Sequence, residues 1–317
     1  MGSDLFAENV TLTLRAMGHV CIALGTARPR IRTKAGTLLA EMALRSVTLD
    51  RAIQRRLVNT VRNAQLEVVI TVESTLFPDT VGALRGAGAR VALWFPDALA
   101  NLDRQLMFLS PYDGLFLKDP LLVDRVRNLL NLPVHYLPEA CNPMWHKPGS
   151  RENVQPFLVI AGNMYPSRVV LLDKLLAAGL PLRLYGGHFD RWMRRTKLFA
   201  CHTGEIITSH RKASIYRAAA GVLNNLHPSE LTGVNCRLFE AAGSGAAVLC
   251  EDRPALADLF EPEREVLAFS TFDELVDQAR MLLDDYEYGT SIGDAGAIRA
   301  HEEHTYEIRL TNILDNL

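Results

Sequence analysis

The stretch GVNCRLFEAAGSGAAVLCED, from Gly233 to Asp252, places a short amphipathic helix directly before an apolar strand. Arg237 and Glu240 lie one helical turn apart, with two apolar residues between them. Two interpretations are open. The charges could form an ordinary surface salt bridge worth a few tenths of a kcal/mol. Alternatively, the N-terminal end of the helix could bind a phosphate while the glutamate binds a sugar.

The same alternation of short apolar runs and helical patterns continues outward in both directions. Strands buried on both faces and joined by helices indicate parallel sheets, so the expected fold class is α/β. The clearest helix is predicted at Thr48–Gln65, with Thr48 and Asp50 as candidates to cap its first turn. The expected strands are His19–Leu24, Glu67–Val72, Arg90–Phe95, Asp113–Leu117, Val134–Leu137, Pro156–Ala161, Leu182–Tyr185, Gly221–Asn225, Ala246–Cys250 and Val266–Phe269.

The chain length of 317 residues suggests two domains, because single cores rarely grow further. The alternation pauses at Cys141–Pro156, which is rich in Pro, Gly and Asn and is the best linker candidate. We expect an N-terminal domain at 1–145, a C-terminal domain at 146–302 and a helix at 303–317 that could cross back. The chain opens as loop, helix and strand, so the first domain either lacks its first strand or the natural polypeptide begins further upstream.

Composition excludes several classes of function. The net charge of −2 provides no general attraction for nucleic acid. The five cysteines form no CxxC pair and read as reduced thiols of a cytoplasmic protein. No apolar run approaches the length of a membrane span. No HExxH or comparable pattern predicts a metal. The basic run Arg191–Lys197 could be a solvated face or could touch an anionic acceptor or lipid headgroups, so weak peripheral membrane contact stays open.

Two strand ends in the second half carry candidate ligand-binding residues. FLVIAGNMYPSR ends a strand at Gly162 and Asn163 and brings Arg168 to the start of a helix, as in anion sites. LRLYGGH ends another strand at Gly186 and Gly187, followed by His188, which could reach a nucleotide. Each could equally be an ordinary strand-to-helix turn.

The helix after Gly233 has candidate caps in Thr232 and Asn235, which would leave other N–H groups free for a phosphate. In the first half, Asp97 ends the run VALWFPD and could act as a general base or simply cap a helix. Glu73 and Glu139 are weaker candidates.

The order of these motifs resembles GT-B glycosyltransferases, most closely the CgeB-like (spore maturation protein) group, over nearly the whole chain. The resemblance implies two Rossmann-like domains that face a cleft, with a nucleotide sugar held mainly by the second domain. The matching pieces are VVITVESTLFPDTVGALRGAGARVALWFPD, YDGLFLKDP, VHYLPEACNP, GNMYPSR, YGG, GEII, IYRAAAGVLNNL, GVNCRLFEAAGSGAAVLCED, LADLFEPEREVLAF, DELVDQARMLLDD and HTYEIR.

The resemblance also implies residue roles. Gly162, Asn163 and Arg168 would lie at the diphosphate or donor sugar, and Glu240 would bind ribose. The N–H groups from Gly233 to Cys236, with Arg237, would hold the phosphates. The loops at Gly186–Gly187 and Gly204–Ile206 would frame the base.

The sequence departs from many retaining members at Thr232, which occupies the place of their first glutamate, eight residues before Glu240. The role of that glutamate is therefore not carried over, and a retaining outcome does not follow. The expected function is metal-independent and cofactor-independent sugar transfer from a nucleoside diphosphate sugar, with UDP favoured, to a hydroxyl of unknown type. The alternatives are a catalytically silent binding or scaffold protein and a GT-B-like epimerase or hydrolase.

Overall fold

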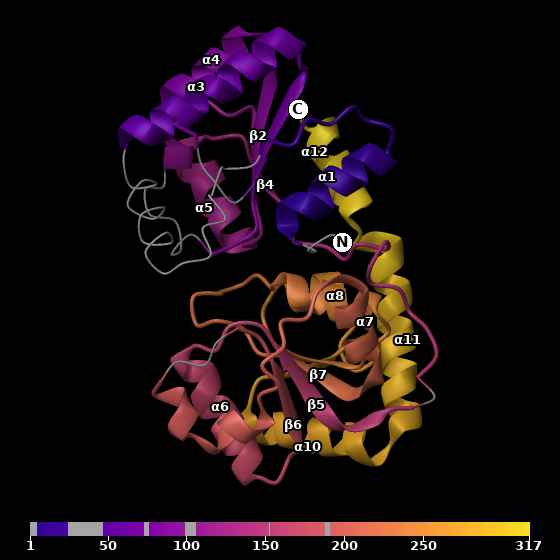
Figure 1. Ribbon diagram of the computed structural model, residues 1–317. Coiled ribbons are helices and arrows are strands. Elements are labelled where there is room, and N and C mark those ends of the chain that lie inside the picture. The colour runs from indigo at the N-terminus through magenta and orange to yellow at the C-terminus, as the bar shows by residue number, and fades with distance from the viewer. Residues whose placement is uncertain (1–4, 25–46, 73–75, 99–105, 152, 188–190) are drawn as a thin grey trace.

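The computed structural model describes residues 5–24, 47–72, 76–98, 106–151, 153–187 and 191–317. It contains two parallel sheets, one in each half of the chain (Figure 1). The α/β class expected from the sequence is confirmed. Two residues named above, Glu73 and His188, lie outside the described residues.

The sheet of the N-terminal half has four parallel strands in chain order, so its crossovers run in one direction. The strands are β1 (Val68–Val72), β2 (Arg90–Phe95), β3 (Gly114–Leu117) and β4 (Val134–Tyr136). Helices α3 (Val47–Ala64), α4 (Pro78–Gly86) and α5 (Pro120–Leu130) cover one face. Helices α1 (Phe6–Ala16) and α12 (Tyr306–Asp315), from opposite ends of the chain, cover the other (Figure 1).

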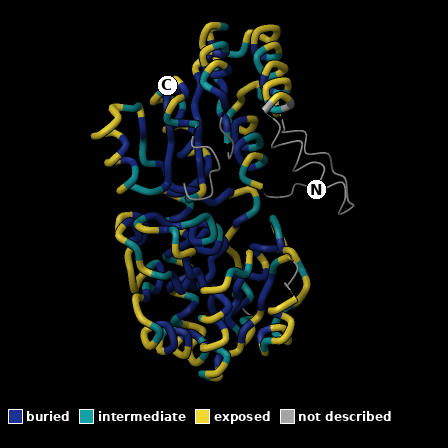
Figure 2. Tube along the Cα trace, turned by 90° about the vertical axis from the view of Figure 1, so that its left-hand side faces the viewer, coloured by how far each residue is buried: buried dark blue, intermediate teal, exposed yellow. Residues whose placement is uncertain are grey.

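Strand β2 shows why this sheet needs both layers. Val91 and Leu93 belong to the core formed with α3, α4 and α5, whereas Ala92 and Trp94 belong to the core formed with α1 and α12. All four are fully buried, as the alternation of side chains in a strand covered on both faces requires. Figure 2 shows this pattern as buried backbone through the centre of each half and exposed backbone outside.

The sheet of the C-terminal half has five parallel strands in the order β6-β5-β7-β8-β9. Its strands are β5 (Gln155–Ala161), β6 (Leu182–Tyr185), β7 (Ala219–Asn224), β8 (Val248–Glu251) and β9 (Leu267–Phe269). From β5 the chain goes to β6 on one side of it and then returns across β5 to β7 on the other side. This reversal creates a topological switch point, where open α/β sheets bind their ligands.

Helices cover both faces of this second sheet. Residues of α7 (Ser209–Ala218), α8 (Cys236–Gly243), α9 (Leu256–Leu259) and α11 (Tyr286–Glu303) pack in one core. Residues of α6 (Pro166–Ala177), α10 (Phe272–Asp284) and the 3₁₀ turns η3 (Met193–Arg195) and η4 (Lys197–Cys201) pack in the other. A further 3₁₀ turn, η2 (Leu106–Phe108), belongs to the N-terminal half.

The chain passes between the halves twice, and the two crossings touch. The amide of Cys141 donates to the His304 carbonyl at 2.9 Å, and the Tyr306 amide donates to the Cys141 carbonyl at 3.1 Å. Arg309 on α12 donates to the Pro138 carbonyl at 3.1 Å. The linker candidate Cys141–Pro156 is thus packed at its start rather than loose.

Two local predictions are wrong. Residues His19–Leu24 form no strand, and Val20 is 93% exposed, because no strand among the described residues pairs with them. Helix α3 already begins at Val47, so Thr48 and Asp50 lie inside its first turn instead of capping it. The other nine expected strands are present, with bounds that differ by at most two residues.

Candidate functional site

The switch point of the second sheet lies between the carboxyl ends of β5 and β7. Strand β7 ends at Asn224 and is followed by a second asparagine, Asn225; the two are 0% and 3% exposed. Each asparagine holds one arginine by its side-chain oxygen. Asn224 Oδ1 accepts from Arg237 Nη1 at 2.9 Å, and Asn225 Oδ1 accepts from Arg168 Nε at 2.9 Å.

Arg168 is 2% exposed and is bound on three sides. Besides Asn225 Oδ1, it donates to the Asn163 carbonyl at 2.7 Å and to the Asn225 carbonyl at 3.0 Å. Its guanidinium also lies over the Tyr165 ring, 4.5 Å from the centroid. Burial, and then the charge of Arg237, lower the pKa of Arg168 to about 10, so it is still cationic at neutral pH. Arg168 therefore fixes the loop after β5 as well as supplying charge.

Both guanidinium groups lie beside Gly162, the first residue after β5. A side chain at this position would place its Cβ 2.7 Å from Arg237 Nη2 and 3.6 Å from Arg168 Nη1. Gly162 also has a φ of +113°, which other residues rarely adopt. Within the described part of the chain, neither arginine has a carboxylate within 4.0 Å. Two adjacent, uncompensated cations at a switch point form a site for an anion.

Glu240 lies on α8, one turn after Arg237, but the two do not pair. Its Oε1 instead accepts from Lys212 Nζ on α7 at 2.7 Å. The surface salt bridge considered from the sequence is therefore absent. Among the described residues only Oε1 has a partner, so Oε2 stays available to accept a hydrogen bond from a ligand.

Two of the expected phosphate-binding residues serve the contact between the halves. Thr232 Oγ1 donates to Asp119 Oδ1 at 2.7 Å, and its amide donates to Asp119 Oδ2 at 3.2 Å. A Cβ on Gly233 would lie 2.5 Å from the Lys118 carbonyl oxygen, so only glycine permits this approach. We therefore place Thr232 and Gly233 at the seam rather than at the anion site. Asn235 caps α8 by accepting from the Arg237 amide at 3.1 Å.

A buried charge cluster crosses the same seam. Lys118 Nζ, at the end of β3, donates to Glu230 Oε1 at 2.6 Å and lies 3.9 Å from Glu139 Oε2. Burial raises the pKa of Glu139 to about 8, and Lys118 offsets only part of this effect. Burial alone would lower the pKa of Lys118, but Glu139 and Glu230 together raise it. Burial raises the pKa of Glu230 as well, so one ammonium faces two carboxyl groups, of which Glu139 keeps its proton at neutral pH.

Asp97 is exposed at the carboxyl end of β2, and its Oδ1 accepts from the Ala98 amide at 2.8 Å. It lines a hollow of about 230 Å³ between the halves. The hollow combines acidic and basic groups with an apolar wall. Its lining includes Lys118, Asp119, Glu230, Leu117, Leu122 and Leu231. A helix that Asp97 could cap would begin among residues 99–105, outside the described part.

The remaining candidates frame the crevice less closely. Gly186 follows β6, where a Cβ would lie 2.5 Å from the Gly162 carbonyl oxygen, so the two loops touch. Gly204 has a φ of +74°, and Ile206 is 71% exposed. No described atom lies within 4 Å of a Cβ placed on Gly187. Cys236 is the first residue of α8, where burial raises the pKa of its thiol well above the usual value.

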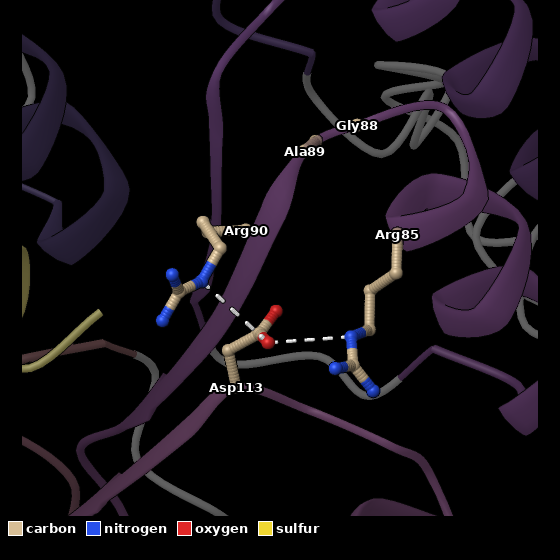
Figure 3. A pocket seen from close by; sticks show the side chains of 5 residues that line it. All are labelled: Arg85, Gly88, Ala89, Arg90 and Asp113. Atoms are coloured by element: carbon tan, nitrogen blue, oxygen red, sulfur yellow. Dashed lines mark ion pairs between the residues drawn. The ribbon is translucent and has the colours of Figure 1, made fainter.

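A larger hollow, of about 450 Å³, lies at the opposite end of the N-terminal sheet (Figure 3). Arg85 and Arg90 converge there, but both pair with Asp113, at 3.2 Å and 3.6 Å. Asp113 also accepts from the Val91 amide at 2.8 Å. The charges are compensated and serve to join strand ends, so we do not place the functional site in this hollow.

In the described part of the chain, no group of three or more His, Cys, Asp or Glu side chains is arranged to hold a metal ion. No helix among those residues is long and apolar enough to cross a membrane.

The sequence did not single out the side chains that position the arginines. Asn224, Asn225 and Tyr165 are ordinary strand-end and loop residues by pattern, and Lys212 reads as one of several charges on α7. The available signal was two consecutive amides at the end of an otherwise apolar strand, where a buried polar group needs a partner.

The comparisons with known proteins agree with this geometry. A family described as "Glycosyl transferase-like" matches residues 168–315, which include Arg168, Arg237 and Glu240. No curated protein matches the chain. The family match supports a glycosyltransferase but does not distinguish the CgeB-like group, which stays a prediction.

Several solved structures share the fold. A glycosyltransferase from Rickettsia africae is 8% identical with a TM-score of 0.63, covering 98% of this chain and 92% of that one. Anabaena Alr3699/HepE in complex with UDP is 11% identical with a TM-score of 0.61, covering 84% and 82%. Sucrose-phosphate synthase from Thermosynechococcus elongatus is 14% identical with a TM-score of 0.60, covering 83% and 77%. These similarities establish the fold, which is GT-B, with two Rossmann-like domains.

Proposed function

We propose that this protein is a glycosyltransferase that takes a sugar from a nucleoside diphosphate donor, with UDP favoured. The observation that carries the proposal is the pair of uncompensated guanidinium groups beside Gly162 at the β5/β7 switch point. A diphosphate matches this site, because it carries several anionic oxygens and guanidinium groups bind such oxygens in pairs. The family match over this half and the complexes of Anabaena Alr3699/HepE with UDP and with UDP-glucose support the choice of donor.

The donor would lie across the ends of β5 and β7. Arg237 has a free Nη2 toward Gly162 and would contact the diphosphate, while the more deeply buried Arg168 would fix the loop beneath it. Because charge builds up on the diphosphate as the sugar leaves, these fixed cations would stabilise the transition state more than the bound donor. The reaction would then need neither a metal ion nor a cofactor. Glu240 would accept a ribose hydroxyl through Oε2, held in place by Lys212.

The acceptor would enter from the N-terminal half, for which we propose the bounds 1–145, facing a donor domain at 146–302. Asp97 lines the hollow at the seam, is exposed, and is the candidate general base for the acceptor hydroxyl. Contact between the halves through Thr232 and Asp119 would exclude water from the donor. In its most specific form, the proposal is a hexosyltransferase of the CgeB-like group, working in the cytoplasm on a hydroxyl acceptor of unknown type.

The test begins with thermal unfolding in the presence of UDP, dTDP, GDP, ADP and CMP, because a ligand that binds only the folded state raises its apparent stability. We expect one diphosphate to raise the unfolding temperature and Glu240→Ala to remove most of that rise. Sugar conjugates of that nucleotide are then incubated with a mixture of hydroxyl acceptors, with and without EDTA. Transfer in both conditions supports the proposal, and failure of every nucleotide to bind would contradict it.

The same assay separates the alternatives. Release of free sugar without an acceptor would indicate a hydrolase, and a changed sugar would indicate an epimerase. Binding without turnover on any acceptor would indicate a silent binding protein. The engagement of Thr232 by Asp119 gives this last alternative its specific support, because no acid occupies that position.

A further inference from the structure

A short segment after β6 gathers cations and aromatic rings on one surface. It comprises residues 191–201 and includes η3 and η4. Met193 and Leu198 are 2% and 0% exposed and pack into the core that α6 shares. Because these two residues fix the segment from below, the side chains between and beside them face outward. The exposed ones are Arg191, Trp192, Arg194, Arg195, Lys197 and Phe199.

The four cations of this segment are uncompensated. Among the described residues, none of them has a carboxylate within 4.0 Å, whereas some other exposed arginines are paired. Arg211, for example, pairs with Glu205 at 3.1 Å, and Arg264 pairs with Glu261 at 2.6 Å. A local cluster of four positive charges therefore stands on a chain whose net charge is −2.

Two aromatic side chains lie among these cations. Trp192 and Phe199 are each 48% exposed, which is unusual for residues of this size. Aromatic rings mixed with Lys and Arg are typical of surfaces that bind at a membrane interface, where the rings enter the headgroup region and the cations bind lipid phosphates.

We propose that residues 191–199 form a docking surface for an anionic lipid bilayer. The four cations bind headgroup phosphates, and Trp192 and Phe199 enter the interface beside them. The attraction is local rather than a property of the whole chain, so it falls steeply with salt and holds the protein reversibly. The proposal does not depend on the sugar-transfer function.

The experiment is sedimentation of the full chain with vesicles of phosphatidylcholine alone or with about one third phosphatidylserine, at low and high salt. We expect binding only to the phosphatidylserine vesicles and its loss at high salt. Tryptophan emission gives a second readout. Trp94 is fully buried and Trp145 donates to Asn9, so a blue shift on binding comes from Trp192 and disappears in Trp192→Phe.

The decisive variant is R194E/R195E, with R55E/R56E on α3 as the matched control. All four arginines are exposed, and each double variant changes the net charge equally. We expect R194E/R195E to weaken vesicle binding by about 30-fold or more and the control to weaken it only slightly. Equal loss in both variants, or equal binding to both kinds of vesicle, would overturn the proposal. A single-stranded oligonucleotide that binds the segment more tightly than the vesicles do would also overturn it, in favour of a nucleic-acid surface.

Discussion

Two pairs of arginines converge in this molecule, and they differ in what stands between them. In the hollow of Figure 3, Arg85 and Arg90 share the carboxylate of Asp113, and the charges serve to hold strand ends together. In the crevice beside Gly162, Arg168 and Arg237 are held by the neutral side chains of Asn225 and Asn224. An amide orients a guanidinium without neutralising it, so the second pair keeps its charge for a ligand. The site beside Gly162 is therefore the functional one.

The difference between the two pairs is tested most strongly by removing one arginine from each. We expect Arg237→Gln to weaken UDP binding about 30-fold, because a charge-assisted hydrogen bond is lost while the glutamine can still donate to Asn224. Arg85→Gln should leave binding unchanged. Titration calorimetry at neutral pH measures both. Equal affinities for the two variants would place the nucleotide elsewhere.

The buried cluster between the halves has the opposite excess, with more carboxyl groups than cations, because Lys118 faces both Glu230 and Glu139. The pKa of Glu139 is raised to about 8 in the folded protein, above the usual value near 4.5. The folded state therefore binds more protons, and stability is greatest at low pH and falls as the pH rises from about 5 to about 8. We expect the free energy of unfolding to fall by a few kcal/mol over this window, because the unfolded chain releases the Glu139 proton at much lower pH than the folded chain does. Urea titrations across pH should show a flatter profile for Glu139→Gln, and an unchanged slope would refute the assignment.

The glycines of the two sites offer a finer comparison. Gly162 and Gly88 both have positive φ, +113° and +93°, so alanine should cost each about 1 kcal/mol in stability. Only at Gly162 would the new Cβ meet an arginine, since nothing lies within 4 Å of the Cβ position at Gly88. Gly162→Ala should weaken UDP binding about tenfold, roughly one lost hydrogen bond, and Gly88→Ala should not. Parallel calorimetric and unfolding measurements test this, and a loss of affinity in Gly88→Ala would argue against it.

The smallest effect is expected from removing the negative charge that Arg85 and Arg90 share. Asp113→Asn would leave Arg85 and Arg90 without a carboxylate. We expect a loss of about 1 kcal/mol, because both arginines are largely exposed and such pairs are weak. Added sulfate should recover part of this loss in the variant and have little effect on the natural protein. Thermal unfolding with and without sulfate measures this effect. An equal effect of sulfate on the variant and on the natural protein would show that Asp113 does not neutralise the pair.

Most of the strands were predictable because residues buried on two faces leave continuous apolar runs. The run at His19–Leu24 has the same appearance but pairs with no strand of the described chain, and a local pattern cannot show whether a partner exists. The GT-B fold follows from the order of the motifs, since that order sets the sheet topology.

The site was less predictable because its key contacts join distant segments. Asn224 and Asn225 look like the end of a strand, and only the folded chain brings them to Arg237 and Arg168. Gly233 looks like a phosphate-loop glycine, but the sequence cannot show that the Lys118 backbone lies against it.

The most direct test is a crystal structure of the protein with UDP. Our account predicts diphosphate oxygens within hydrogen-bond distance of Arg237, beside Gly162, with the ribose near Glu240. A diphosphate bound between Arg85 and Arg90, or one that leaves the crevice beside Gly162 empty, would contradict the central claim.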